Sequence, residues 1–235
     1  MHAFLTGAVT TVLYLILAAA SALIARRLLT IPDELFRKLL HFILLGAYIP
    51  LVFAFDTWWS AAILVLALLV IIYPILLAAT HLPSFSSFMV ERKKGEYMSS
   101  MVLALCMMFC SVTLCWGLAG DRYLVLACIY AWGVGDAFAA LVGKRFGRHK
   151  IKWRYSDSHK SFEGSLAMFL CSVGSVWTVL MLRGGLSLPV CILIAVIAGA
   201  VCTVAELCAR GGYDTVICPT AAMVVILPLV MIFGG

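Results

Sequence analysis

The sequence predicts an all-α integral membrane protein that crosses the bilayer about eight times. Hydrophobic residues make up 64% of the chain and charged residues 12%, which is about half the charged share of an ordinary soluble domain. The mean hydropathy of +1.10 means more apolar surface than one small globule can bury, so lipid must cover the rest. No segment has the composition of a linker or of a second domain, and we therefore expect a single membrane-embedded domain over residues 1–235.

Runs of about 20 mostly apolar residues mark the spans, because a helix of that length crosses the hydrocarbon core. The last connections are tight, which leaves a short or re-entrant segment there as an alternative. The expected spans cover residues 4–25, 36–55, 58–79, 98–118, 122–142, 163–182, 187–208 and 216–233.

The loops predict the orientation of these spans. Fifteen of the 17 lysines and arginines fall on one side of the membrane, and the other side holds Arg122 and Arg183. Since lysine and arginine are retained in the cytoplasm, we expect the basic side to face the cytoplasm and both termini to lie outside. The fifteen are Arg26, Arg27, Arg37, Lys38, Arg92, Lys93, Lys94, Lys144, Arg145, Arg148, Lys150, Lys152, Arg154, Lys160 and Arg210.

Neither the net charge nor the cysteines point to another class of protein. The charge of +6 comes from short loops between apolar runs, which is typical of membrane topology and of anionic partners rather than of nucleic-acid binding. Nearly all of the nine cysteines lie inside apolar runs without a Cys-x-x-Cys pair. We expect them to act as small apolar packing residues, not as a disulfide framework or a metal site.

Four acidic residues stand within or at the edge of apolar runs near the basic side of the membrane. They are Asp136, Glu163, Glu206 and Asp214. An ionisable group at membrane depth costs about 3 kcal/mol even on the lenient insertion scale, so each marks a candidate functional site. Asp136 is surrounded by glycines and alanines, which would let another helix or a ligand approach closely.

Structural explanations for the same acids remain open. Asp136 could pair with a lysine to hold two helices together. Glu163 could be a first-turn acid favoured by the helix dipole, with Ser161 as N-cap. Asp214 follows two glycines and could be a loop acid. Glu206 falls on the last turns of its helix, where the dipole disfavours an acid, so its position asks for a cation or a metal as partner.

The loop at 143–161 is rich in lysine and arginine and is bordered by glycines and carboxylates. Contact with anionic lipid head groups explains its charge but not this order. Glycines free backbone N–H groups to wrap a phosphate, lysines add cations, and carboxylates hold Mg²⁺ together with phosphate oxygens. These features suit the chemistry of a magnesium-bound nucleotide. A P-loop is excluded, because Gly143-Lys144 is followed by Arg145.

Taken together, short motifs over most of the chain after residue 35 resemble the CTP-dependent lipid kinases, the family of phytol kinase, dolichol kinase and the CTP-using diacylglycerol kinase. This family is similar to the phosphatidate cytidylyltransferases. The motifs are Arg37-Lys38-x-x-His41, Glu91-Arg-Lys-Lys-Gly95-Glu96, Gly135-Asp136-x-x-Ala139 with Gly143-Lys144-x-x-Gly147, Lys160-Ser161-x-Glu163-Gly164-Ser165, and Glu206-x7-Asp214 with Pro219. Each is weak alone, but five in the expected order on one predicted membrane face are specific. A lone histidine such as His41 is more often structural.

Departures from the pattern favour the kinases. Their last motif usually reads Asp-Asn, whereas this chain has Asp214-Thr215, which weakens any role for an asparagine amide there. The carboxy-terminal signature of the cytidylyltransferases is missing from the sequence. Their Ser-Pro-x-Lys-Thr is replaced here by Ser156-Asp-Ser-His-Lys160-Ser161.

The resemblance implies transfer of the γ-phosphate of CTP to the hydroxyl of a membrane lipid alcohol, most naturally an isoprenoid alcohol, with Mg²⁺ as cofactor. Lys144 and Lys160 would neutralise charge on the phosphates, and Glu206 or Asp214 would bind metal or accept the hydroxyl proton. The candidate catalytic residues are Asp136, Lys160, Glu163, Glu206 and Asp214; the candidate metal ligands are Asp136, Glu206 and Asp214; the candidate nucleotide-binding residues are Gly135, Gly143, Lys144, Gly147, Ser161, Gly164, Arg92 and Glu96.

Two alternatives stay beside the kinase. A CDP-lipid synthase would release pyrophosphate instead of CDP. A transporter would tend to place its acids near the middle of the membrane on broken helices, whereas these acids gather at one edge. The sequence leaves open which lipid alcohol is used, among phytol, polyprenols and diacylglycerol, and also the oligomeric state.

Overall fold

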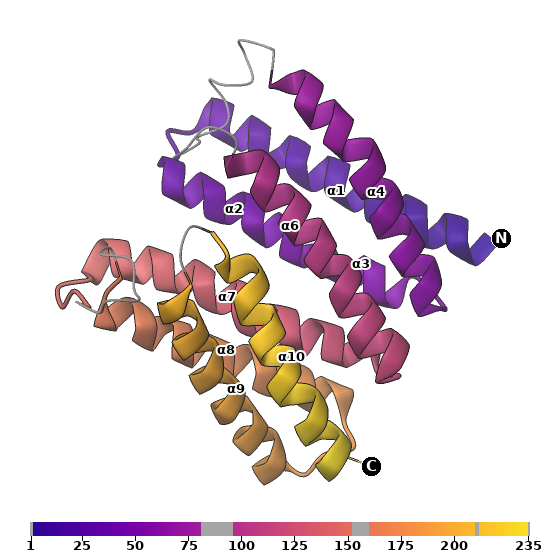
Figure 1. Ribbon diagram of the computed structural model, residues 1–235. Coiled ribbons are helices and arrows are strands. Elements are labelled where there is room, and N and C mark those ends of the chain that lie inside the picture. Colours follow the sequence, from indigo (N-terminus) through magenta and orange to yellow (C-terminus); the bar gives the residue numbers. More distant parts are fainter. Residues whose placement is uncertain (1, 81–95, 152–159, 210–211, 235) are drawn as a thin grey trace.

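The computed structural model describes residues 2–80, 96–151, 160–209 and 212–234, and their secondary structure is helical apart from one isolated β-bridge. The protein is an all-α polytopic membrane protein, as the sequence predicts (Figure 1). The helices are α1 (His2–Leu28), α2 (Asp33–Gly46), α3 (Tyr48–Phe53), α4 (Trp58–Ala79), α6 (Glu96–Ser111), the π-helix η1 (Val112–Leu118), α7 (Arg122–Phe146), α8 (Phe162–Arg183), α9 (Leu188–Cys208) and α10 (Asp214–Phe233).

Among the described residues, eight stretches are long and apolar enough to cross a membrane, and they match the eight predicted spans within a few residues. Two spans are composite. The second, Asp33–Phe53, joins α2 and α3 at Ala47, and the fourth, Met98–Leu118, runs from α6 into η1. The last two spans are full-length helices, so the re-entrant alternative is not what the structure contains.

Helix α7 is the centre of the bundle. Its middle is buried on all sides, with Val125, Ala127, Cys128 and Ile129 completely inaccessible to solvent. It packs along α8 for most of its length and also contacts α2, α3, α10 and η1. A helix that is apolar all round is suited to this central position, whereas α1 exposes apolar residues along most of its surface, as a lipid-facing helix does.

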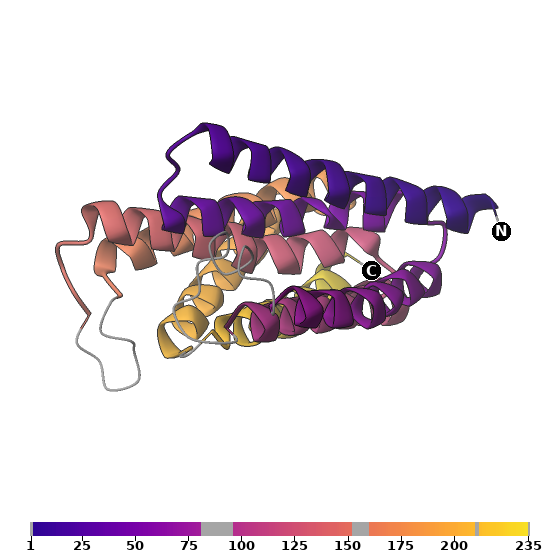
Figure 2. The same ribbon diagram turned by 90° about the horizontal axis from the view of Figure 1, so that it is seen from above.

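The helices run between two ends of the bundle. The carboxyl ends of α1, α4, α7 and α9 lie at one end, and both ends of the described chain lie at the other (Figures 1 and 2). Of the described lysines and arginines, Arg122 and Arg183 belong to the other end and the rest to the first, so the predicted segregation of charge is present in the described part of the fold. We call it the basic end.

Candidate functional site

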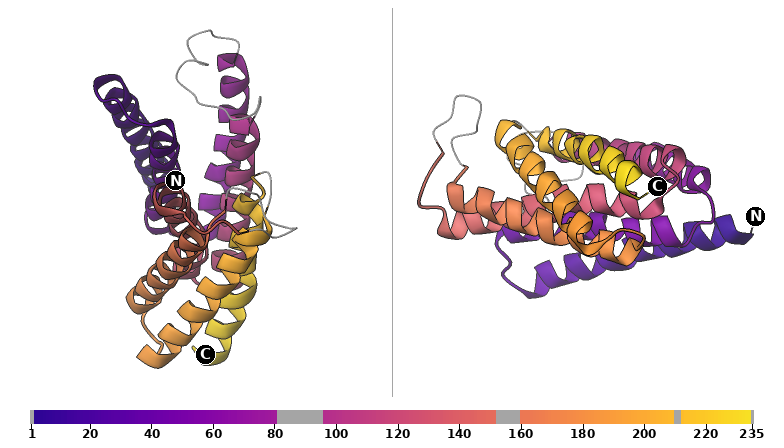
Figure 3. Two further views of the ribbon diagram at one scale, coloured as in Figure 1. Left: turned by 90° about the vertical axis from the view of Figure 1, so that its left-hand side faces the viewer. Right: turned by 90° about the horizontal axis from the view of Figure 1, so that it is seen from below.

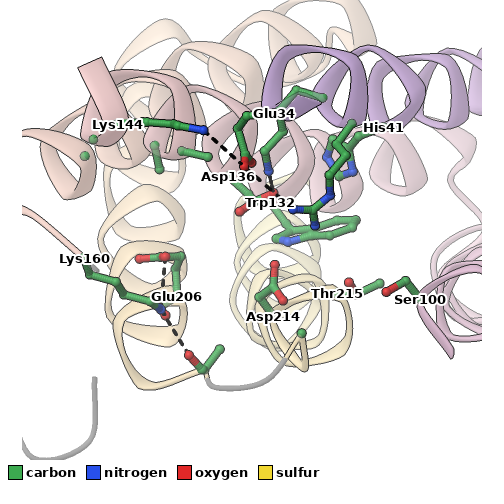
Figure 4. A pocket seen from close by; sticks show the side chains of 18 of the residues that line it. Glu34, His41, Ser100, Trp132, Asp136, Lys144, Lys160, Glu206, Asp214 and Thr215 are labelled. Atoms are coloured by element: carbon green, nitrogen blue, oxygen red, sulfur yellow. Dashed lines mark hydrogen bonds and ion pairs between the residues drawn. The ribbon is translucent and has the colours of Figure 1, made fainter. Parts of the chain in front are cut away.

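A cavity of about 810 Å³ opens at the basic end, between α2, α6, α7, α9, α10 and the start of α8 (Figure 4). Most of its charged side chains come from segments that are far apart in the sequence. We call it the charged cavity. The charged and imidazole side chains that line it are Glu34, Arg37, Lys38, His41, Asp136, Lys144, Lys150, Lys160, Glu206 and Asp214.

Asp136 pairs with a lysine across two helices. The Nζ of Lys38 on α2 donates to Oδ2 of Asp136 on α7 at 2.6 Å, and both side chains are largely buried. The pair therefore holds α2 against α7, as the structural explanation of Asp136 anticipates. Because both groups also line the charged cavity, the pair brings a carboxylate and a cation to its wall.

Lys160 closes the carboxyl end of α9. Its Nζ lies 3.1 Å from Oε1 of Glu206 and donates to the backbone oxygens of Glu206 and, at 3.1 Å, of Ala209. These carbonyls belong to the last turn of α9, where carbonyl oxygens lack partners within the helix. Lys160 is therefore the cationic partner that we expected for Glu206. Its Nζ is held by three oxygens.

Asp214 is the first residue of α10 and not a loop residue, so the helix begins two residues earlier than the sequence predicts. An acid in the first turn is favoured by the helix dipole. Among described residues Asp214 has no ion-pair partner within 4 Å, and Figure 4 shows its carboxylate turned into the charged cavity. Of the predicted acids that line the cavity, it is therefore the one best placed to meet a ligand.

The carboxylates of Asp136, Glu206 and Asp214 all line the charged cavity and repel one another electrostatically. In the part of the chain that the structure describes, no three histidine, cysteine, aspartate or glutamate side chains are grouped closely enough to hold a metal ion by themselves. Mg²⁺ bound with a nucleotide needs one or two protein carboxylates, because phosphate oxygens and water complete its shell. The arrangement suits a metal that arrives with a phosphate ligand better than a permanently caged one.

Glu163 serves the basic loop and does not line the charged cavity. Its carboxylate accepts from the backbone N–H groups of Arg148 and His149, both at 3.2 Å, and lies 2.7 Å from Nδ1 of His149. The base of the loop is closed by backbone hydrogen bonds between Ile151 and Lys160 and between Phe162 and His149. Glu163 thus fixes the path of the chain out of α7.

Ser161 is the N-cap of α8, as the sequence predicts. Its Oγ accepts from the backbone N–H of Gly164 at 3.2 Å. It also lines the charged cavity, at the place where the end of α7 and the start of α8 approach each other.

Most of the predicted nucleotide-binding glycines have a packing reason as well. A Cβ on Gly164 would lie 2.9 Å from the backbone oxygen of Ala139, and one on Gly147 would lie 2.1 Å from that of Gly143. A Cβ on Gly135 would collide with Ser172 and Met168 on α8. Small residues at these positions let α7 and α8 approach closely. Gly143 and Gly164 also line the cavity, but Gly135 and Gly147 do not.

The remaining predicted nucleotide-binding residues are Lys144, Arg92 and Glu96. Lys144 lines the cavity, is 69% exposed and lies 4.0 Å from Oε2 of Glu34. Arg92 lies outside the described residues. Glu96 is the first residue of α6, and its side chain is not described.

Sequence reasoning missed several residues of the cavity wall, among them Glu34, Trp132 and Lys150. His41, interpreted as structural, does hold a helix contact, with Nε2 2.9 Å from the backbone oxygen of Gly133, but it also lines the cavity. A signal was available: residues four apart share a helix face, which puts Trp132 beside Asp136.

No family model matches this chain, and no curated protein or solved structure matches it either. The interpretation of the site therefore rests on its chemistry and on the motif resemblance. The charged cavity combines carboxylates and cations among helices that are long and apolar enough to cross a membrane. Such a combination can bind a polyanion with a divalent cation next to lipid.

Proposed function

We propose that the protein is a CTP-dependent lipid kinase, which transfers the γ-phosphate of CTP to the hydroxyl of a membrane lipid alcohol. The acceptor would be an isoprenoid alcohol of the phytol or polyprenol type, or diacylglycerol. The observation that carries the proposal is the charged cavity itself, where four of the five kinase-like motifs contribute residues from α2, α7, α8 and the α9–α10 region. Residues brought together from separate motifs support a shared role.

The cations of the cavity support a triphosphate as ligand. Lys144 is largely exposed, and Lys160 lies beside the end of α9, below Lys144 in Figure 4. Phosphoryl transfer depends mostly on positioning and on neutralising the charge of the phosphate oxygens. We propose that Lys144 binds the phosphates directly, and that Lys160 does so while anchored to Glu206. Cytidine as the base comes from the family resemblance alone.

The carboxylates fit a magnesium ion that is shared with the nucleotide. Asp214 faces the cavity without an ion pair to any described residue, and Asp136 stands on the neighbouring wall. We propose that Asp136 would hold the ion together with the phosphates, which leaves Asp214 to accept a proton. When bound, Mg²⁺ would neutralise charge on the phosphates.

The reaction itself needs one proton acceptor. The lipid hydroxyl oxygen forms a bond to the γ-phosphorus, the bond from that phosphorus to the bridging oxygen breaks, and CDP leaves with the electron pair. The hydroxyl proton moves to a nearby carboxylate, for which Asp214 is our candidate because it is not neutralised by a described lysine within 4 Å. The site would face the cytoplasm, where CTP is present, in keeping with the excess of basic residues at this end.

Asp214→Asn tests the proposal with little change in shape. Purified protein is incubated with γ-labelled CTP, Mg²⁺ and a panel of lipid alcohols, and label in the lipid is counted. We expect the wild type to label at least one alcohol and the variant to lose at least ~10²-fold of that rate, the usual scale for one preorganised charge contact. Asp56→Asn is the matched control, because Asp56 is exposed at the opposite end of the bundle.

Label that appears in pyrophosphate and not in lipid would show that the protein is a cytidylyltransferase and not a kinase. Full activity of Asp214→Asn would remove Asp214 from the proposed site. Loss of activity in Asp56→Asn as well would mean that the assay reports general damage and not chemistry.

A further inference from the structure

Helices α2 and α6 line the same cavity but are packed mainly against other helices. α2 packs on α1, α3 and α7, whereas α6 packs on α4, α10 and η1. The left view of Figure 3 shows the pair α1–α2 and the pair α4–α6 diverging toward the basic end. Both α2 and α6 belong to stretches that are long and apolar enough to cross a membrane.

The walls of the charged cavity that come from these two helices carry apolar as well as charged side chains. Leu40 and Leu44 contribute from α2, and Met101 and Ala104 from α6. Along α2 these leucines alternate with Lys38 and His41, so one helix presents both kinds of surface to the same cavity. An apolar flank that leads to a charged floor fits a ligand with a hydrocarbon chain and a polar end.

A buried donor lies where the two surfaces meet. Trp132 is only 5% exposed, and its buried Nε1–H has no hydrogen-bond partner among the described residues. A buried polar group without a partner costs free energy, which a ligand can recover. His41 packs edge-on against the indole, with ring centroids 5.0 Å apart, and so fixes its orientation. In Figure 4 the indole nitrogen is turned toward the side where Asp214 lies.

We infer that the lipid alcohol enters sideways between α2 and α6. Its chain lies along Leu40, Leu44, Met101 and Ala104, and Trp132 Nε1–H donates a hydrogen bond to its hydroxyl oxygen. The hydroxyl is thereby presented to the carboxylate of Asp214. Trp132 is a positioning residue in this scheme. The inference deepens the proposed kinase and rests on it for the identity of the ligand.

A photoreactive probe tests the entry route without any phosphoryl transfer. Protein in lipid nanodiscs is irradiated with a long-chain isoprenoid alcohol that carries a diazirine, and the labelled peptides are identified by mass spectrometry. We expect label on α2 and α6 around Leu40 and Ala104, and we expect excess unlabelled alcohol to remove it. Label confined to other helices would overturn the route, whatever the result of the kinase assay.

Ala104→Phe blocks the proposed route, since Ala104 is 9% exposed and lines the cavity. We expect the competable label to disappear and kcat/KM for the long-chain alcohol to fall by roughly 10-fold or more, because even small changes in an apolar pocket have that effect. A short, water-soluble alcohol should be used as before. Cys106→Phe is the matched control, since Cys106 is exposed on the same helix. Leu40→Phe repeats the test from α2 if Ala104→Phe does not fold.

Trp132→Phe tests the hydroxyl contact, because it keeps an aromatic ring against His41 and removes the donor. We expect kcat/KM for every alcohol, short or long, to fall by roughly tenfold, the value of one hydrogen bond. An unchanged kcat/KM would overturn this contact. If the probe labels α2 and α6 but no alcohol is phosphorylated, the proposed kinase fails while the lipid route stands.

Discussion

Two cavities flank α7, and they differ in what their polar groups do. The charged cavity lies on the face of Trp132, Asp136 and Gly143. The second, the apolar cavity of about 480 Å³, lies on the face of Tyr123, Tyr130 and Val134, against α3 and α8, and none of the residues that line it is charged. Both lie beside membrane spans, yet only the first holds groups that can bind a phosphate.

In the apolar cavity the polar groups are used within the protein. The hydroxyl of Tyr130 donates to the backbone oxygen of Leu45 at 3.3 Å, and that of Ser175 donates to the backbone oxygen of Tyr130 at 3.1 Å. In the charged cavity, by contrast, Trp132 Nε1–H has no described hydrogen-bond partner, and the carboxylate of Asp214 faces inward without an ion pair to a described residue. The comparison separates a groove that lipid can fill from a site that can act on a ligand.

Charge pairs at the two ends of the bundle extend the comparison. Arg183 donates to Asp121 at the end opposite the cavity, and Asp121 also caps α7 by accepting from Tyr123 N–H at 2.8 Å. That pair joins two helix ends and borders no described charged cavity. The Lys38–Asp136 pair joins helices as well, but lines the site. Stability and activity should therefore respond differently at the two ends.

The largest expected effect comes from Asp136→Asn. Transfer of label from CTP to lipid should fall by at least ~10²-fold. The thermal midpoint should also drop, because Lys38 would be left buried without its partner, a change that costs roughly 3–5 kcal/mol. The double variant with Lys38→Met should recover stability but not activity.

Asp121→Asn is the control at the opposite end of the bundle, and it should lose stability and keep activity. An active Asp136→Asn would contradict the account.

Lys160→Ala should reduce the transfer rate by at least ~10²-fold as well, with a comparable loss of stability. The side chain contacts Glu206 and the last carbonyls of α9, so its removal leaves both a carboxylate and a helix end without their cation. The rate and the thermal midpoint are measured on the same preparation. A stability loss with unchanged activity would mean that Lys160 is a helix cap and takes no part in phosphate binding.

Two glycines of α8 give the smallest and most finely matched test. Gly164→Ala should lower the free energy of unfolding by roughly 1–3 kcal/mol, because its Cβ would meet the backbone oxygen of Ala139. Gly174 borders open space in the apolar cavity, so Gly174→Ala should raise the free energy of unfolding by roughly 0.5–1 kcal/mol, because alanine has the higher helix propensity. Thermal unfolding of both variants checks this. Equal effects would show that the close approach of α7 and α8 is not tight.

The spans could be predicted from the sequence because length and apolarity alone decide whether a helix can cross a bilayer. The gathering of Asp136, Glu206 and Asp214 in one cavity also followed, since all three stand at the same edge of their spans. The sequence could predict that Asp136 and Glu206 have partners, but not which residues these partners are. That Lys38 meets Asp136, and that Glu163 turns to the loop, depends on how helices far apart in the sequence are rotated against each other.

The glycines show the same limit. Gly135 and Gly147 were interpreted as nucleotide contacts, but each also sits where a side chain would collide with neighbouring atoms. A glycine required by helix packing and one required by a phosphate look alike in sequence. Trp132 was overlooked for the converse reason, because a tryptophan within an apolar span looks like a packing residue until its buried nitrogen is found without a described partner.

The most direct test of the charged cavity as a phosphoryl-transfer site uses two CTP preparations, one labelled at the α-phosphate and one at the γ-phosphate. Each is incubated with the purified protein, Mg²⁺ and an isoprenoid alcohol in nanodiscs, with and without a chelator. The account predicts that the γ-label alone moves into the lipid, that the α-label is recovered in CDP, and that the chelator stops both. An α-label in the lipid, or no transfer to any lipid alcohol, would contradict it.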